Sequence, residues 1–265
     1  MKKDRIVRLV ESALLLALAT VLSLIKLLDL PYGGSITAAS MLPIILIAYR
    51  HGVGYGMFSA LVYSLIQMLL GMNNFSYFKT PGAVIVLALF DYVLAFAVLG
   101  LGGVFRKRMP QRQALVCGTV LACVLRYICH VISGCTIWAG LSIPDSAALL
   151  YSLAYNATYM LPETIVTALA AGYIGSALDL REGIPTPVKA EGRARFGVLS
   201  AIGQLIGVAA LATDVVLVFS QLQDGETGDF MIAGLSSVNW LAFAAVTAVG
   251  VLAAVVLTMI DRRRA

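Results

Sequence analysis

Charged side chains are scarce in this sequence. Asp, Glu, Lys and Arg make up 12% of the 265 residues, whereas apolar residues make up 60%. Soluble domains carry about 25% charged residues, so the composition excludes an ordinary soluble protein and indicates one that crosses a membrane several times. The net charge of +5 does not point to nucleic acid, because the basic residues lie in short gaps between apolar runs, where they orient a membrane protein.

Motifs for nucleotide binding and catalysis are missing as well. The sequence has neither a P-loop GxxxxGK[ST] nor an HExxH motif, and no nucleophile motif accompanies its two histidines. We therefore expect no catalytic residue and no cofactor in this chain. An intramembrane enzyme that uses His130 with Asp91 or Glu163 remains an alternative, because acid-base chemistry depends on distances that a sequence does not supply.

Cysteines are few and regularly spaced. Cys117, Cys123, Cys129 and Cys135 follow at six-residue intervals within one predicted helix. Six residues turn a helix by roughly 600° and raise it by about 9 Å. Neighbours in this series therefore face different directions, which excludes one shared metal site and a disulfide between adjacent members. We interpret them as small packing residues, and we predict no metal site.

Apolar runs long enough to cross about 30 Å of hydrocarbon occur eight times. They cover residues 8–28, 36–49, 52–71, 81–104, 113–138, 147–177, 197–220 and 234–259. With a cytoplasmic N-terminus, 16 of the 19 Lys and Arg residues fall on the cytoplasmic side, so both termini are predicted to be cytoplasmic. The first run also has the outline of a signal peptide, but Glu11 within it favours a retained helix.

The predicted fold class is an all-α polytopic membrane protein. Residues 1–180 form a six-helix substrate-binding domain, and residues 196–265 form a two-helix membrane extension. The stretch 181–195, with Gly183, Pro185 and Pro187, is the predicted cytoplasmic linker. The extension contains Asp214 as the one charge within its predicted crossings, and we assign it no ligand role.

One apolar run contains a stripe of ionisable and aromatic residues. Arg126, His130, Gly134 and Trp138 recur every four residues, so a helix aligns them over about 18 Å. A charge inside a bilayer is costly unless it faces a bundle interior, water or a partner. We interpret the stripe as one wall of a pocket for a small, flat, polar heteroaromatic ligand, with room for the ring at Gly134. The alternative is a core histidine with a tryptophan at the membrane interface.

Asp91 and Tyr92 lie at a similar predicted depth on a neighbouring helix. They are about ten residues into the run that starts near Pro81, hence roughly 15 Å below the outer surface. Asp91 either pairs with Arg126 structurally or meets a cationic ligand.

The sixth run adds further polar residues. Tyr151 and Asn156 lie in its outer half, and Asn156 can both donate and accept hydrogen bonds. Glu163, two turns deeper and directly after Pro162, is interpreted as a packing or conformational element.

Two outer loops flank the predicted pocket. The first, Leu30–Pro43, fits either a cover over an outward-facing pocket or an ordinary turn with a helix cap. The second contains Tyr77 and Phe78 as interface anchors or as part of a lid. In the first helix, Ala13 and Ala17 form a small-xxx-small pair that lets another helix come close.

Over residues 5–180 the sequence resembles the thiamine-specific S component of energy-coupling factor (ECF) transporters. The likeness lies in Gly33-Gly34-Ser35 leading to Pro43, Arg50-x-Gly52-x-x-x-Gly56 with Tyr63 and Gln67, Asp91-Tyr92-x-x-Ala95-Phe96, the stripe from Arg126 to Trp138, and Tyr151 with Asn156. The resemblance implies a subunit of the bacterial cell membrane that captures thiamine with high affinity. It would import thiamine with a transmembrane coupling protein, which the Ala13/Ala17 face would contact, and two ATPase subunits.

The resemblance also implies roles for the site residues. Trp138 and His130 would flank the rings, Asp91, Tyr92, Tyr151 and Asn156 would supply polar contacts, Gly134 would provide clearance, and Arg126 would lie behind the ligand or at its hydroxyl end. A positively charged thiazolium suits a carboxylate and an aromatic face, so Asp91 is the expected charge partner.

The sequence departs from this family at several points. Asp91 and Arg126 stand where the family more often has Glu and Lys, which moves the carboxylate back by one methylene. The first-loop aromatic residue that caps the ligand has no clear counterpart in this sequence, and Tyr32 is the best candidate for it. The two-helix extension has no counterpart in the six-helix family.

A stand-alone proton-coupled secondary transporter of thiamine or a related heterocycle is the alternative function. Asp91, His130 and Glu163 would then form a proton relay. The sequence lacks the internal inverted repeat that is usual for that class, which favours the ECF interpretation.

Overall fold

The computed structural model describes residues 2–30, 33–77, 80–140, 145–181, 183–188, 198–222 and 231–264, with the backbone alone at 2–4, 77, 137–140, 145–146 and 262–264. The chain divides into two compact units, Met1–Pro187 and Val188–Ala265. The boundary between them falls inside the stretch 181–195 that the sequence analysis assigned to a linker.

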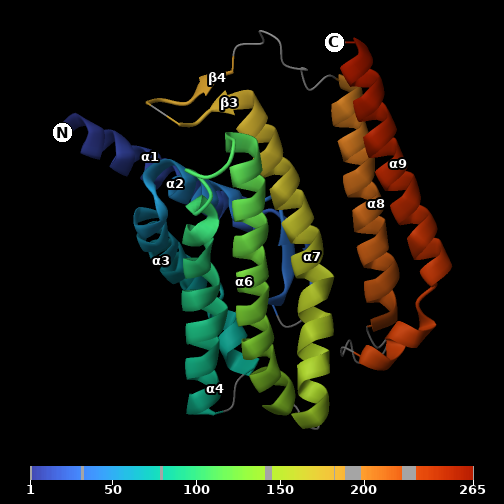
Figure 1. Ribbon diagram of the computed structural model, residues 1–265. Coiled ribbons are helices and arrows are strands. Elements are labelled where there is room, and N and C mark those ends of the chain that lie inside the picture. Colours follow the sequence, from blue (N-terminus) through green and yellow to red (C-terminus); the bar gives the residue numbers. More distant parts are fainter. Residues whose placement is uncertain are drawn as a thin grey trace. The chain divides into compact units, whose positions relative to one another are not determined.

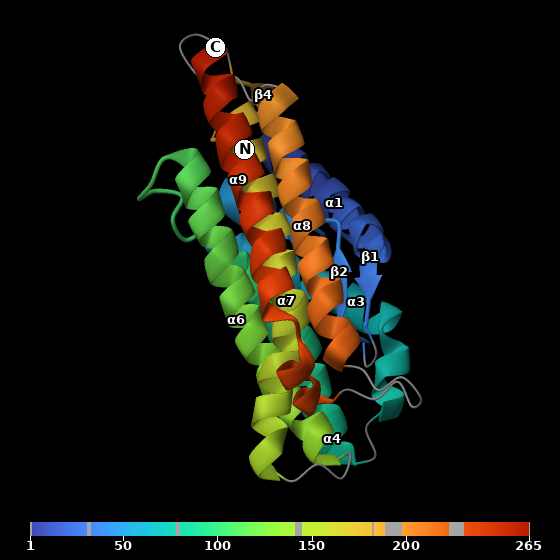
Figure 2. The same ribbon diagram turned by 90° about the vertical axis from the view of Figure 1, so that its right-hand side faces the viewer.

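The first unit is a helical bundle with two short hairpins (Figure 1). Its elements in chain order are α1 (Lys2–Leu24), β1 (Lys26–Asp29), β2 (Ser35–Thr37), α2 (Leu42–His51), α3 (Val53–Leu70), η2 (Met72–Tyr77), α4 (Pro81–Val86), η3 (Leu87–Leu94), α5 (Ala95–Ala97), η4 (Val98–Gly103), α6 (Gln111–Gly140), α7 (Asp145–Ala177), β3 (Leu178–Asp179) and β4 (Thr186–Pro187). The helical segments from α4 to η4 follow one another without a break. The long helices α6 and α7 lie side by side (Figures 1 and 2).

Within the described residues, six helices are long and apolar enough to cross a membrane. They are Arg5–Leu24, Val53–Leu70, Pro81–Gly103, Gln111–Thr136, Val198–Leu222 and Trp240–Asp261. The other two predicted crossings correspond to α2, which has ten residues, and to α7, which buries Asn156 and Glu163. The prediction of an all-α polytopic membrane protein is confirmed.

The prediction for the second crossing, residues 36–49, was wrong at its start. Ser35–Thr37 is strand β2, which pairs antiparallel with β1 and places Ile36 opposite Leu28. β-Branched side chains favour this extended conformation. Helix α2 begins at Leu42 with Pro43 in its first turn, where the missing N–H costs no helical hydrogen bond.

Helix α2 lies at the core of the first unit. Nine of its ten residues, from Leu42 to Arg50, are buried, as expected for a helix that is apolar on nearly all sides. Tyr49 packs with Leu115 of α6 and Ala171 of α7 in one apolar cluster. Close approach of η4 to α2 depends on Gly103, because a Cβ there would collide with the carbonyl of Ala48.

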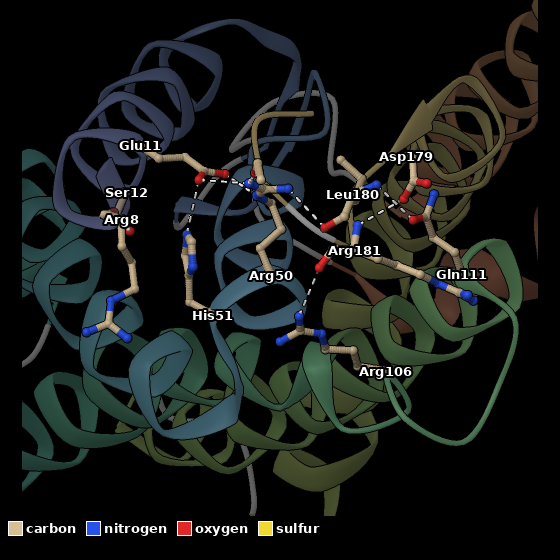
Figure 3. A network of polar contacts seen from close by, with 11 residues as sticks. Arg8, Glu11, Ser12, Arg50, His51, Arg106, Gln111, Asp179, Leu180 and Arg181 are labelled. Atoms are coloured by element: carbon tan, nitrogen blue, oxygen red, sulfur yellow. Dashed lines mark hydrogen bonds and ion pairs between the residues drawn. The ribbon is translucent and has the colours of Figure 1, made fainter. Parts of the chain in front are cut away.

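A polar network joins α1, α2, α6 and the chain after α7 (Figure 3). Arg50, the last buried residue of α2, binds the carboxylate of Glu11 in α1 through Nε and Nη2. It also donates to the carbonyls of Leu180 at 2.9 Å and Gly183 at 2.6 Å. Gln111 at the start of α6 accepts from the Leu180 N–H at 2.9 Å. These bonds attach α1 to the rest of the bundle.

The second unit is a pair of helices, α8 (Val198–Leu222) and α9 (Trp240–Arg264), with the short helix η5 (Ile232–Ser237) between them. A Cβ on Gly203 would lie only 3.0 Å from the carbonyl of Ala253, so the backbones approach closely. Asp214 in α8 is 5% exposed and accepts a 2.6 Å hydrogen bond from Thr247 in α9. Asp214 therefore helps to hold this pair together.

Candidate ligand-binding site

A cavity of about 70 Å³ lies in the first unit, between the Gly33–Ser35 segment, η3, α6 and α7. Its described lining consists of Gly33, Gly34, Ser35, Asp91, Arg126, His130, Gly134, Tyr155, Asn156 and Tyr159. On the same measure of volume, one buried water needs about 10–15 Å³. The cavity is therefore several times larger than the site of a single water molecule. Five of the eight predicted ligand-binding residues thus meet around one space.

Asp91, His130 and Arg126 form a hydrogen-bonded chain on the cavity wall. Nδ1 of His130 lies 2.7 Å from Oδ1 of Asp91, and Nε of Arg126 donates to Nε2 of His130 at 3.0 Å. A guanidinium can only donate, so Nε2 must accept and Nδ1 must carry the ring hydrogen. The neutral imidazole therefore separates the carboxylate from the guanidinium. Of the two alternatives left open by the sequence, direct pairing of Asp91 with Arg126 does not occur in the described structure, where Asp91 contacts His130. Contact of Asp91 with a cationic ligand stays a prediction.

Arg126 has further donor capacity at this wall. Its guanidinium carbon lies 4.5 Å from the centre of the Phe96 ring, a favourable cation–π distance. Its Nη1 is buried and has no hydrogen-bond partner among the described residues. Leaving a buried donor without a partner is costly, so Nη1 suits an acceptor atom of a ligand.

The opposite wall comes from α7. Asn156, 3% exposed, donates to the carbonyls of Ser152 at 2.8 Å and His130 at 3.3 Å. It also accepts from the Tyr159 hydroxyl at 2.5 Å. These bonds orient the Asn156 side chain and couple α7 to the residue that bridges Asp91 and Arg126.

Tyr155 and Tyr159 line the cavity but were not predicted. The hydroxyl of Tyr155 accepts a 3.0 Å hydrogen bond from the backbone N–H of Gly34. The Tyr159 ring meets His130 edge-on with centroids 6.1 Å apart. Their four-residue spacing after Tyr151 places all three tyrosines on one helix face, and that spacing was the signal in the sequence.

Gly134 lines the cavity for a reason different from the predicted one. A Cβ at this position would collide with the Ser152 hydroxyl and lie 3.0 Å from Nδ2 of Asn156. The space next to Gly134 is therefore filled by α7. Its missing side chain permits the two helices to pack, whereas the sequence analysis assigned that room to the ligand.

Asp91 and Tyr92 lie in η3, a π-helical stretch. The N–H of Ala95, which follows it, bonds to the carbonyl of Phe90, five residues back. Such wide turns are rare and occur often at functional sites. Here adjacent residues serve different purposes, because Asp91 lines the cavity and Tyr92 does not.

The prediction that Tyr92 contacts the ligand is not supported by its position. Its hydroxyl donates to the Gly71 carbonyl at 3.0 Å and accepts from Asn74 at 3.1 Å, and its ring stacks on Phe75. A Cβ on Gly33 would lie 2.6 Å from Nδ2 of Asn74, so Asn74 packs directly against the cavity-lining segment. Tyr92 therefore supports this wall from behind.

The remaining predicted residues are placed as follows. Tyr151 lies in α7 and is not among the described lining residues. The backbone of Trp138 continues α6 one turn beyond Gly134, but its side chain lies outside the described part of the structure, as do Tyr32 and Phe78. Ala13 and Ala17 are both exposed on α1, a helix that is mostly uncovered.

Fold and site together define a polytopic membrane protein with a polar cavity between the helices of its first unit. A family model described as thiamine transporter protein (Thia_YuaJ) matches residues 9–179. The chain therefore belongs to the thiamine transporter family and is a multi-pass protein of the cell membrane. The family match confirms the resemblance noted in the sequence, and it ends before α8 and α9.

Two relatives agree with this membership. The thiamine transporter ThiT of Bacillus subtilis (strain 168) is 34% identical over 180 residues, which cover 63% of this chain and 90% of that protein. A solved structure of ThiT from Listeria monocytogenes is 26% identical, has a TM-score of 0.53, and covers 65% of this chain and 94% of its own. The family membership implies a transporter rather than an enzyme.

Proposed function

We propose that this chain is the high-affinity thiamine-binding membrane subunit of an ECF-type vitamin importer. The observation that carries the proposal is the Asp91 carboxylate, 25% exposed, at a cavity enclosed by polar and aromatic side chains. Thiamine carries a permanent positive charge on its thiazolium ring. A carboxylate inside a membrane protein is costly unless it meets such a charge or a hydrogen-bond donor.

The other wall residues suit the rest of this ligand. Nη1 of Arg126, which has no partner among the described residues, would donate to the hydroxyl group of thiamine. Oδ1 of Asn156 accepts from Tyr159 and has a second lone pair for the amino group of the aminopyrimidine ring. His130 and Trp138 supply flat surfaces for the rings. Tyr92 acts through the Gly33–Ser35 wall and does not touch the ligand in this proposal.

Import would require partner subunits. We propose that the exposed Ala13/Ala17 face of α1 contacts a transmembrane coupling protein, and that two ATPase subunits hydrolyse ATP, since this sequence has no P-loop. Leu14 is 67% exposed and Leu18 47% exposed, so the same side of α1 offers apolar surface. A partner helix can pack closely against the two alanines.

Thiamine should quench the tryptophan fluorescence of the purified protein. The sequence contains two tryptophans, so Trp240→Phe leaves Trp138 as the single reporter. We expect quenching in the natural protein and in Trp240→Phe, and none in Trp138→Phe, because Trp138 would stack on the ligand. Unchanged fluorescence together with no calorimetric heat at micromolar thiamine would contradict the assignment of the ligand.

Thiamine uptake should depend on the ATPase partners. In vesicles that contain this chain with a coupling protein and ATPase subunits, we expect uptake driven by ATP. Substituting Ala13 and Ala17 by Leu should abolish this uptake and leave thiamine binding unchanged, because bulkier side chains keep a partner helix away. Uptake by the chain alone, driven by a proton gradient, would instead favour a secondary transporter.

A further inference from the structure

The segment that forms one cavity wall is attached to α7 at two points. At the first, the Gly34 N–H donates to the Tyr155 hydroxyl at 3.0 Å. At the second, Oγ1 of Thr37 lies 2.7 Å from Oε1 of Glu163. Tyr155, Tyr159 and Glu163 follow at four-residue intervals and share a face of α7. One helix face therefore carries both part of the cavity wall and the second attachment.

Glu163 is a buried carboxyl group that the proposed ligand site does not use. It is 2% exposed and is not among the described lining residues. Thr37 and Ser40 are also buried, and their hydroxyl oxygens lie 2.8 Å apart. The Thr37 hydroxyl has one hydrogen. When it donates this hydrogen to Glu163, its oxygen accepts a hydrogen bond from the Ser40 hydroxyl. The carboxyl group thus ends a short chain of hydrogen bonds.

The turn that this chain of bonds spans is strained. Ala39, between Thr37 and Ser40, has a φ of +59°, a left-handed conformation that residues other than glycine rarely adopt. Such a conformation persists where surrounding contacts hold it. Besides backbone bonds such as the one from the Ala39 N–H to the Thr37 carbonyl, this turn is held by the hydroxyls of Thr37 and Ser40 and by the carboxyl group of Glu163.

We propose that Glu163 is a positioning residue for ligand binding. By accepting a hydrogen bond from Thr37, it holds the turn Thr37–Ser40, and with it the adjoining Gly33–Ser35 segment, against α7 in the arrangement that encloses the cavity. The ligand-binding part of this inference rests on the proposed thiamine function, whereas the attachment itself does not.

The first test measures thiamine affinity and dissociation rate in variants of the two partners. Thr37→Val and Glu163→Met should each weaken binding about tenfold, mainly through faster dissociation, because the wall is released. Thr37→Ser and Glu163→Gln keep a donor and an acceptor, and both should stay within about threefold of the natural protein. The double variant Thr37→Val/Glu163→Met should be no weaker than the worse single variant, since both changes remove one interaction.

Thr167→Val is the matched control. Thr167 lies one turn beyond Glu163 on the same helix, is fully buried, and has a hydroxyl without a partner among the described residues. We expect its affinity to change less than twofold. The proposal would be overturned if Thr167→Val lost as much affinity as Thr37→Val. It would also be overturned if Glu163→Gln bound thiamine as weakly as Glu163→Met, because that result would show that the ionisable carboxyl group matters and the hydrogen bond does not.

A ligand-free measurement separates this inference from the function. Backbone amides at 33–40 should exchange hydrogen faster in Thr37→Val and Glu163→Met, and at the natural rate in Thr167→Val. Unchanged exchange in both partner variants would refute the attachment. If the natural protein binds no thiamine, the proposed function fails, and the exchange measurement still decides whether Glu163 holds this segment.

Discussion

Replacing Asp91 with Asn should weaken thiamine binding by roughly 100-fold or more. Removing one partner of a buried charge pair costs about 3–5 kcal/mol, and about 1.4 kcal/mol corresponds to a tenfold change in affinity. The estimate uses the lower part of this range, because the Asp91 side chain is 25% exposed. Isothermal titration calorimetry of the purified variant measures the change directly.

The control ligand for this experiment is a thiamine analogue whose thiazolium is replaced by a neutral aromatic ring. The Asp91→Asn change should weaken binding of this analogue much less than binding of thiamine, because the analogue has no charge for Asp91 to balance. Asp29→Asn is the control variant: this carboxylate lies in strand β1, away from the described cavity lining, pairs with Lys26 at 2.9 Å and is 58% exposed. It should change affinity less than twofold. Equal losses for both ligands in Asp91→Asn would exclude a charge-pairing role.

Replacing Arg50 with Ala should lower the melting temperature of the protein by roughly 6–20 °C. The change leaves Glu11, 19% exposed, without its main charge partner and removes two hydrogen bonds to carbonyls (Figure 3). Loss of one member of a buried pair costs about 3–5 kcal/mol, and 1 kcal/mol shifts the melting temperature of a chain of this size by about 2–4 °C. Thermal unfolding in detergent measures the shift.

Arg106→Ala is the matched control for Arg50. Arg106 belongs to the same network (Figure 3), but it is only half-buried, and among the described residues its side chain makes a single 3.3 Å bond, to the Arg181 carbonyl. Its replacement should change the melting temperature by less than about 2 °C, as is usual for a surface contact. The double variant Arg50→Met/Glu11→Met should be more stable than Arg50→Ala, because no unpaired charge remains. Similar shifts in Arg50→Ala and Arg106→Ala would show that the buried pair contributes no more than a surface contact.

The polar residues of the cavity were predictable in part. Asp91, Arg126, His130 and Asn156 interrupt long apolar runs, and such interruptions are rare enough to indicate a site. Tyr155 and Tyr159 were not predicted, because an uncharged tyrosine does not mark a site within a membrane helix as a charged residue does. Their contribution depends on α7 facing both Gly34 and His130, which is a matter of packing.

The structure places two of the predicted residues in surroundings that differ from the predicted ones. Tyr92 directly follows Asp91, and even a regular helix turns neighbouring residues by about 100°. Its side chain therefore points elsewhere, toward Gly71, Asn74 and Phe75. Gly134 was assigned to ligand clearance because it stands in the polar stripe. The contact that explains it comes from Ser152, on another helix.

The amino-acid sequence alone determined that this is a polytopic membrane protein, where most of its crossings lie, and which family it resembles. Hydropathy and charge are properties of short segments, and they do not depend on which segments touch. Only the tertiary structure decided that β2 replaces the start of the second predicted crossing, that His130 stands between Asp91 and Arg126, and that Glu163 meets Thr37. The bonds from Asp91 to His130 and from Thr37 to Glu163 join residues far apart in the chain, and such contacts exist only once the segments have packed. Strand β2 depends on its pairing with β1, which hydropathy does not report.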